Sequence, residues 1–309
     1  MKETDTYKEL NPKALYQWID EKRNFTLIDT LKSDSFTRRH LKNAVNACVF
    51  EVTFVDQVNA ITDDMNSVIV LYGASKRSFD AVTAAEKLTQ NGYTDIYILK
   101  GGIEDWLSEG FFLEGEAVNE TYDPQTVLTL EDGSYKIDTD QSIIEWSGRN
   151  PTTTHFGTVE IASGQIIVTN GIITGTFDIN MDSIQNKSLE GDELQPVLID
   201  HLKSDDFFLT KIFPTARYEI NKAEPVKEPF LSFPNYGISG NLELRGIKAQ
   251  QDFMATITKT PEKNLMVEAH FDIDRTKWGI IYGSSRFFEC LGIHMVFDLI
   301  SLQIRVVTN

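Results

Sequence analysis

The segment from Ile69 to Ser78 combines an apolar strand with a short loop that could do chemistry. Ile69-Val70-Leu71-Tyr72 is followed by Gly73-Ala74-Ser75-Lys76-Arg77-Ser78, and a helical pattern begins directly afterwards. Backbone amides at the start of a helix, with two cations beside them, form an anion-binding cradle. The alternative is that Lys76 and Arg77 are merely solvated. Neither serine has an evident general base, so we expect Ser78 to cap the helix rather than act as a nucleophile.

The two cysteines of the chain both lie outside this loop. Cys48 and Cys290 are far apart in the sequence and indicate neither a disulfide framework nor a thiolate zinc site. Cys48 begins the apolar run Cys48-Val49-Phe50, which we expect to be a strand that buries the thiol as a small hydrophobic group. We expect hydrogen-bonded structural roles, with no metal site and no cofactor, for the scattered histidines His155, His201, His270 and His294.

The elements that must position the loop alternate between strands and helices. Phe25 to Ile28, Val68 to Tyr72 and Ile96 to Leu99 are short apolar runs, typical of strands buried on both faces of a parallel sheet. A helix between the second and third runs is predicted from the spacing of Phe79, Val82, Ala85 and Leu88, and Asn91-Gly92 ends it. These patterns predict an α/β domain with a parallel sheet over residues 1–118.

Three motifs in this domain resemble the single-domain rhodanese family. They are Thr26-Leu27-Ile28-Asp29-Thr30 with the later turn from His40 to Asn46, the loop from Tyr72 to Ser78, and Lys100-Gly101-Gly102-Ile103-Glu104-Asp105-Trp106. The resemblance implies a thiolate at the start of the helix. Gly73 or Ala74 stands at that position, and Leu31 stands where the family has an arginine. We therefore expect a catalytically inactive recognition or scaffold domain, with no catalytic residue among Gly73, Ala74, Ser75, Lys76, Arg77 and Ser78.

The second half of the chain has the patterning of an all-β domain. The chain becomes polar after Glu116, which predicts a linker over residues 119–132. From Tyr135 onward apolar and polar residues alternate, as in Ile238-Gly240-Leu242-Leu244 and Val267-Ala269-Phe271-Ile273. Turns at Ser163-Gly164 and Asn170-Gly171 join such strands, and one helix is expected from Leu194 to Leu202. The pattern predicts an antiparallel barrel or sandwich.

A second resemblance covers the span from Tyr135 to Val307. Its motifs include Ile144-Glu145-Trp146-Ser147-Gly148, His155-Phe156-Gly157, Phe213-Pro214-Thr215-Ala216-Arg217-Tyr218 and Asp274-Arg275-Thr276-Lys277-Trp278-Gly279-Ile280. They resemble the YceI-like family, lipocalin-like barrels that bind polyisoprenoids or related amphiphiles. The resemblance implies a β-barrel domain over residues 133–309 that binds an apolar or amphiphilic small molecule. A homodimer is a candidate assembly, because homodimers occur among the relatives of the barrel.

Ligand contacts in such a barrel are expected from inward-facing residues. A plain packed core would use the same residues, so period-two patterning leaves a lined cavity and a packed interaction protein as alternatives. The segment from Asp274 to Trp278 either offers a polar mouth for a headgroup or ties a loop to the barrel wall. The candidate ligand-binding residues are Trp146, Phe177, Ile179, Tyr218, Leu242, Leu244, Phe271, Ile273, Trp278 and Phe297.

Composition narrows the choice of partners and functions. The formal net charge is −17 and both halves are acidic, which argues against nucleic acid and anionic membrane faces as stable partners. No apolar run approaches the roughly 18 residues of a membrane helix, and the polar N-terminus does not resemble a secretory signal, so we expect a cytoplasmic protein without membrane insertion. The leading hypothesis is a carrier of a polyisoprenoid, quinone or fatty-acyl type ligand. The alternative is a sulfurtransferase or anion-processing enzyme that uses Cys48 or the Lys76/Arg77 loop.

Overall fold

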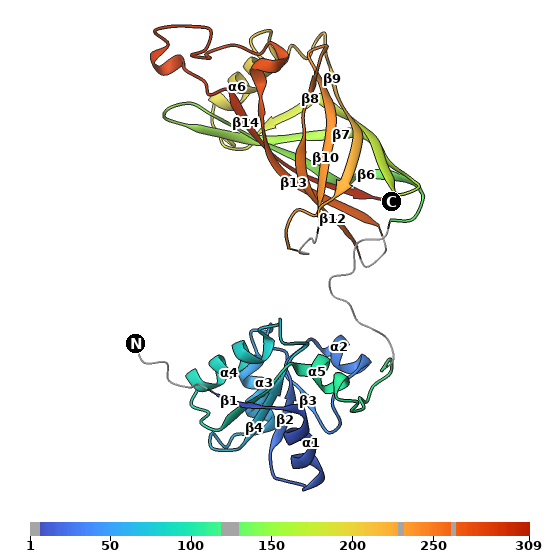
Figure 1. The fold of residues 1–309 in the computed structure, drawn as a ribbon. Helices are drawn as coiled ribbons and strands as arrows, with labels where there is room; N and C mark the ends of the chain where they lie inside the picture. Colours follow the sequence, from blue (N-terminus) through green and yellow to red (C-terminus); the bar gives the residue numbers. More distant parts are fainter. Residues whose placement is uncertain (1–6, 119–129, 228–231, 261–263) are drawn as a thin grey trace. The chain divides into compact units, whose positions relative to one another are not determined.

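The computed structural model describes residues 7–118, 130–227, 232–260 and 264–309. The chain divides into two compact units, Met1–Tyr122 and Asp123–Asn309 (Figure 1). Most of the predicted linker over residues 119–132 lies outside the described residues. Within the described ranges, no helix combines the length and apolar character needed to cross a bilayer.

The first unit is the predicted α/β domain with a parallel sheet. The strands in spatial order are β1 (Lys8–Leu10), β5 (Ile96–Leu99), β4 (Ile69–Tyr72), β2 (Thr26–Asp29) and β3 (Val45–Asn46). The helices are α1 (Pro12–Asp20), α2 (Ser33–Arg38), α3 (Phe54–Ile61), α4 (Asp80–Gln90) and α5 (Gly102–Ser108). All four residues of the central strand β4 are buried, which explains its unbroken apolar run.

Two hydrophobic cores lie on opposite faces of this sheet. In one, Phe54 of α3 and Leu88 of α4 pack against Ile69 and Leu71 of β4. In the other, α1 and α5 cover Val70 and Tyr72, the alternate side chains of the same strand. Because both faces are covered, the loop after β4 is held between α4 and α5.

The predicted inner face of α4 is only partly right. Gly92 follows the helix with a φ of +96°, as expected of a glycine that terminates a helix. Phe79, however, precedes the helix and is 76% exposed. The helix packs through Ala81, Ala84, Ala85 and Leu88 instead. Small alanines let α4 lie close to the sheet, and a bulky phenylalanine is not needed on that face.

The second unit is a closed antiparallel barrel. Its eight strands are β6 (Gly133–Arg149), β7 (Thr154–Thr169), β8 (Ile172–Asn186), β9 (Thr215–Pro225), β10 (Tyr236–Leu244), β12 (Phe253–Lys259), β13 (Leu265–Asp274) and β14 (Leu299–Thr308). Pairing of β10 with β9 closes the sheet, and β11 (Ile247–Gln250) forms an additional hairpin with β10. The barrel alternative of the sequence prediction is thereby confirmed.

The two predicted turns have different outcomes. Asn170 and Gly171 have φ of +52° and +74° between β7 and β8, the conformation that an Asn-Gly hairpin turn favours. Ser163-Gly164 was predicted wrongly as a turn, since both residues lie inside β7 next to a register shift. A Cβ on Gly164 would lie 2.9 Å from the Thr176 carbonyl oxygen. The glycine therefore allows a close approach of two strands at a bulge.

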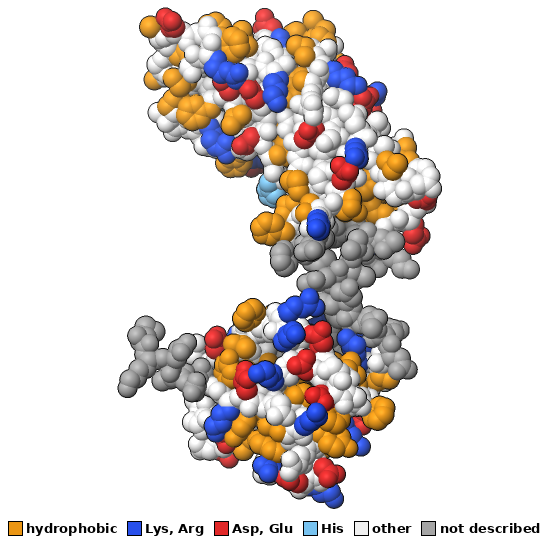
Figure 2. All heavy atoms as spheres, in the orientation of Figure 1, with side chains coloured by type: hydrophobic (Ala, Val, Ile, Leu, Met, Phe, Trp, Pro, Cys, Tyr) orange, Lys and Arg blue, Asp and Glu red, His pale blue; other side chains and the backbone are white. Residues whose placement is uncertain are grey.

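One end of the barrel carries the remaining elements, α6 (Leu194–Lys203), η1 (Arg275–Trp278) and η2 (Gly292–His294) (Figure 1). The predicted helix from Leu194 to Leu202 matches α6 to within one residue. On the face drawn in Figure 2, acidic and basic side chains are interspersed over both units.

Candidate functional site

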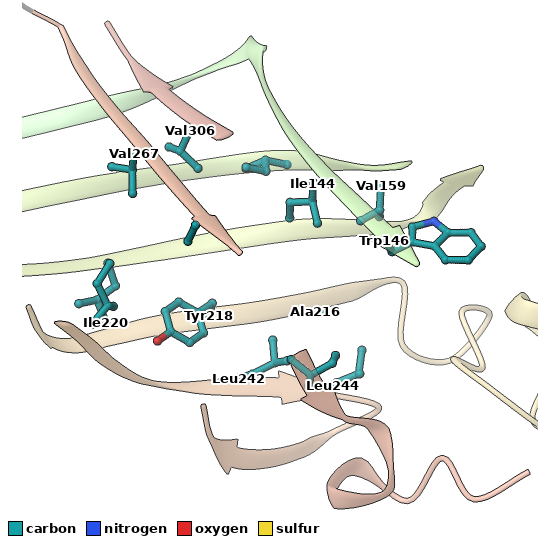
Figure 3. Close-up of a cluster of buried hydrophobic side chains, with 14 of the residues drawn as sticks. Ile144, Trp146, Val159, Ala216, Tyr218, Ile220, Leu242, Leu244, Val267 and Val306 are labelled. Carbon is teal, nitrogen blue, oxygen red and sulfur yellow. The ribbon is translucent and has the colours of Figure 1, made fainter. Parts of the chain in front are cut away.

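The barrel encloses an apolar cavity with a volume of about 350 Å³. Its wall is built from the inward side chains of every strand of the barrel, because alternate residues of a strand face the same side. Figure 3 shows part of the buried hydrophobic cluster that forms this wall. Ile144 and Val159 lie on one side, and Tyr218, Leu242 and Leu244 lie on the other. The arrangement offers a nonpolar molecule a space shielded from water.

Nine of the ten candidate ligand-binding residues line this cavity. They are Trp146, Phe177, Ile179, Tyr218, Leu242, Leu244, Phe271, Ile273 and Phe297. Trp278 is not among the lining residues in the described part of the chain. It is fully buried, and its indole N–H donates to the Leu242 carbonyl oxygen at 2.8 Å. Direct contact between a ligand and any of these nine residues stays a prediction.

Tyr218 places a hydroxyl group in the cavity wall. The hydroxyl donates to the Gln251 backbone carbonyl at 2.8 Å, and burial raises the pKa of Tyr218 from its usual value of 10. The phenol is therefore neutral across the physiological range. Gly240 makes room for it, because a Cβ at residue 240 would lie 2.5 Å from the hydroxyl oxygen.

Arg275 closes part of the barrel end that carries α6. Its side chain is 1% exposed, and its guanidinium donates to the carbonyl oxygens of Ile280 (2.6 Å), Val296 (2.9 Å) and Phe297 (3.2 Å). Asp298 lies 3.5 Å away as a counter-ion. Of the two alternatives for Asp274 to Trp278, these contacts favour the tie between a loop and the barrel wall. The sequence could not reveal them, because all three acceptors are backbone atoms.

The same end also carries two of the histidines. His201 of α6 lies 3.0 Å from Asp206 through Nε2 and packs edge-on against the rings of Phe207 and Tyr282. His155 of β7 contacts the Ser188 hydroxyl through Nδ1 at 3.1 Å. Both line the cavity. Within the described ranges, no group of three His, Cys, Asp or Glu side chains is arranged to hold a metal ion.

In the α/β domain, a carboxylate of the chain itself contacts the loop that was predicted as an anion cradle. Asp80, the first residue of α4, is 7% exposed and accepts hydrogen bonds from the Ser78 hydroxyl at 2.5 Å and the Ala74 amide at 3.3 Å. Ser78 thus donates to Asp80, and no side-chain cap is made by Phe79, the residue that precedes the helix. The Ala74 amide and the Ser78 hydroxyl are therefore bonded within the chain.

Helix α5 holds the other side of the loop. The amides of Ile103 and Glu104 donate to the carbonyl oxygens of Gly73 and Ala74 at 3.0 and 3.1 Å. Gly102 permits this approach, because a Cβ there would lie 2.2 Å from the Gly73 oxygen. The Gly-Gly pair noted in the sequence therefore serves to dock α5 on the loop.

Asp29 lies buried at the end of β2, below the loop. The side chain is fully buried; Oδ1 accepts from the Leu31 amide at 2.8 Å, and Oδ2 has no hydrogen-bond partner in the described part of the chain. Burial raises the pKa of this carboxyl to about 6, against the opposing effects of the Leu31 amide and the nearby Tyr72 hydroxyl. Nothing in the sequence motif distinguishes this carboxyl from an ordinary one.

Cys48 is buried, as expected, but it does not begin a strand. The strand β3 ends at Asn46, and Cys48 lies in the turn region that leads to α3, with 5% of its surface exposed. Its amide donates to the Gln57 side chain at 3.1 Å. The neighbouring Phe50 is 72% exposed, so the apolar run does not form a buried strand.

Fold and cavity together define a lipocalin-like barrel protein preceded by a rhodanese-type α/β domain. Comparison with family models agrees with both assignments. The YceI-like domain model matches residues 135–308, and the Rhodanese-like domain model matches residues 11–109. Because the first match spans more than half of the chain, the protein belongs to the YceI-like family.

Solved structures similar to each domain are distant in sequence. BcnA from Burkholderia cenocepacia is 15% identical, with 56% of this chain and 99% of that chain covered and a TM-score of 0.45. A polyisoprenoid binding domain from Saccharophagus degradans is 13% identical, with 57% and 97% covered and a TM-score of 0.40. The BH2092 protein from Bacillus halodurans is 21% identical, with 36% and 79% covered and a TM-score of 0.33.

Proposed function

We propose that the barrel binds and carries one small apolar or amphiphilic molecule. The observation that carries this proposal is the apolar cavity of about 350 Å³ inside a closed barrel. Each Å² of apolar ligand surface removed from water contributes roughly 25 cal/mol. A ligand of modest size can therefore bind without a charged anchor.

The size of the cavity restricts the ligand. Sites for small molecules span about 300–1,000 Å³, and this cavity lies near the lower bound. A polyisoprenoid, quinone or fatty-acyl ligand fits the apolar wall, provided that the enclosed part is short. The remainder of a longer chain would extend through an end of the barrel.

The proposal is tested by blocking the cavity. Ile304 of β14 lines it, whereas the neighbouring Gln303 faces outward and is exposed. Ile304→Trp is expected to weaken binding of a medium-chain fatty acid at least tenfold, because the indole would fill the space. Gln303→Trp introduces the same side chain on the outer face and should leave the affinity unchanged. Calorimetric titration would measure both, after native mass spectrometry and solvent extraction have identified any ligand that copurifies. Wild-type protein that takes up no amphiphile would contradict the proposal.

The α/β domain is proposed as a non-catalytic recognition or scaffold module. Two features support this assignment: the loop after β4 has no thiol, and the Asp80 carboxylate accepts hydrogen bonds from the Ala74 amide and the Ser78 hydroxyl of that loop. Cys48, the nucleophile of the alternative hypothesis, is 5% exposed.

A cysteine introduced at residue 73 should not create a sulfurtransferase. Its Cβ would lie 2.7 Å from Asp80 Oδ2 and 2.9 Å from Asp80 Cβ, and the carboxylate would disfavour a neighbouring thiolate. We expect no transfer of sulfur from thiosulfate to cyanide by the wild type, Gly73→Cys or Cys48→Ser. Turnover that Cys48→Ser abolishes would instead support the enzyme hypothesis.

A further inference from the structure

The indole N–H of Trp146 is a buried donor without an acceptor. Four buried side-chain atoms in the described residues have no hydrogen-bond partner: Asp29 Oδ2, Trp146 Nε1, Thr260 Oγ1 and Asp298 Oδ1. Of these residues, Trp146 alone lines the barrel cavity. It is 8% exposed, so bulk water does not readily satisfy the donor.

The other buried tryptophans show that this fold can satisfy an indole. Trp278 donates to the Leu242 carbonyl at 2.8 Å, and Trp106 donates to the Phe112 carbonyl at 3.0 Å. A buried tryptophan normally finds such a partner, and leaving the donor unmade is costly. Trp146 departs from this rule at the wall of the cavity that we propose to be the ligand site.

The surroundings of Trp146 place it where the cavity wall changes from apolar to polar. Trp146 pairs with Gly157 across β6 and β7, and the next inward pair towards the end of β6 is Gly148 with His155. A Cβ added at Gly148 would meet no described atom within 4 Å. Beyond it, the lining includes Asn150 and His201 together with His155. Figure 3 shows Trp146 beside Ile144 and Val159, at the edge of the apolar cluster.

We infer that the Trp146 N–H is the polar anchor of the ligand and donates to a ligand oxygen. This inference rests on the proposed binding function and defines the ligand class: an amphiphile with a carbonyl or carboxylate oxygen next to an apolar tail. The headgroup lies between Trp146 and the end with His155 and His201. The tail extends towards Ile166 and Val306, apolar lining residues beyond Ile144 and Val159.

Three probes of similar chain length separate the headgroup from the tail: decanoic acid, methyl nonyl ketone and decane. Each is titrated calorimetrically into the delipidated full-length wild type and Trp146→Phe, which removes the N–H but keeps an aromatic ring. For the acid and the ketone, the variant should bind about tenfold more weakly, over and above any loss seen with decane. Comparison of acid with ketone shows whether the charge of the carboxylate matters.

The outcomes are distinct. An equal loss for decane and ketone would mean that Trp146 only packs against the tail, and would overturn the anchor while leaving the carrier function intact. Failure of all three probes to bind the wild type would overturn both.

Stability provides a second readout that does not need a ligand. Trp146→Phe and Trp278→Phe both replace an indole by a phenyl ring. Only the Trp278 variant loses a hydrogen bond, the one from the indole N–H to the Leu242 carbonyl. The Trp278 variant should therefore unfold at clearly lower denaturant concentration than the Trp146 variant. Equal destabilisation would indicate that the Trp146 donor is satisfied in the free protein and would contradict the inference.

Discussion

Replacement of Arg275 by alanine is expected to lower the free energy of unfolding of the barrel by about 3–5 kcal/mol. The guanidinium is fully enclosed and donates to three backbone carbonyls, which the variant would leave buried without donors. Asp298 would lose its buried counter-ion and keep the exposed Arg286 at 3.7 Å. Chemical denaturation measures the loss, and hydrogen exchange should show the earliest opening in residues 280–298, the segment that Arg275 holds.

Arg286→Ala is the matched control for this prediction. Arg286 also pairs with carboxylates, Asp274 at 2.7 Å and Asp298 at 3.7 Å, but its side chain is 55% exposed. Exposed ion pairs typically contribute about 0–1 kcal/mol, so the control should unfold nearly as the wild type does. Similar losses for both variants would mean that the arginine charge, and not the enclosed set of carbonyl contacts, stabilises this end of the barrel.

Replacement of Asp29 by asparagine is expected to stabilise the α/β domain at neutral pH. The pKa of Asp29 rises from 3.8 to about 6 on folding, so the folded chain binds the proton more tightly than the unfolded chain. The contribution of Asp29 to stability is therefore fully present below about pH 4 and is lost as the pH rises through about 6. The shift corresponds to about 3 kcal/mol. Asparagine removes this loss and can still accept from the Leu31 amide.

Calorimetric unfolding of the full-length protein between about pH 4 and pH 8 tests the sign of this effect. The gain of Asp29→Asn over the wild type should be smallest near pH 4, grow as the pH rises and be almost complete at about pH 6. Asp80→Ala serves as a contrast, because it removes an acceptor of two hydrogen bonds and should destabilise the domain by about 1–3 kcal/mol. Parallel pH profiles for the wild type and Asp29→Asn would show that burial of the Asp29 carboxyl carries no such penalty.

Local pattern was sufficient for the fold wherever one physical requirement dominated. A strand with both faces covered must be apolar throughout, as β4 is, and a strand with one wet face must alternate, as β10 and β13 do. The predictions of secondary structure were wrong where a residue type is compatible with two different local structures. Gly164 indicates a turn by type, yet it permits a strand contact; Phe79 fits a helical spacing, yet it stands outside the helix.

For the cavity, the same alternation identified the inward side chains but not the features that depend on long-range packing. Trp278 follows the end of β13, where the chain leaves the strand, so period-two reasoning no longer applied to it. The role of Arg275 depends on how residues 280–298 fold across the barrel end, and the isolated donor of Trp146 depends on which atoms fail to reach it. Neither is encoded in spacing.

The carboxylate of Asp80 also bears on how this loop could evolve. A mutation to cysteine at residue 73 would meet the Asp80 side chain at once, whereas loss of Asp80 alone would leave the Ala74 amide and the Ser78 hydroxyl without their acceptor. Each single substitution is expected to destabilise the domain before any sulfur chemistry appears. Because the two residues are in contact, their substitutions are expected to have non-additive effects, so a thiol at residue 73 requires a simultaneous change at residue 80.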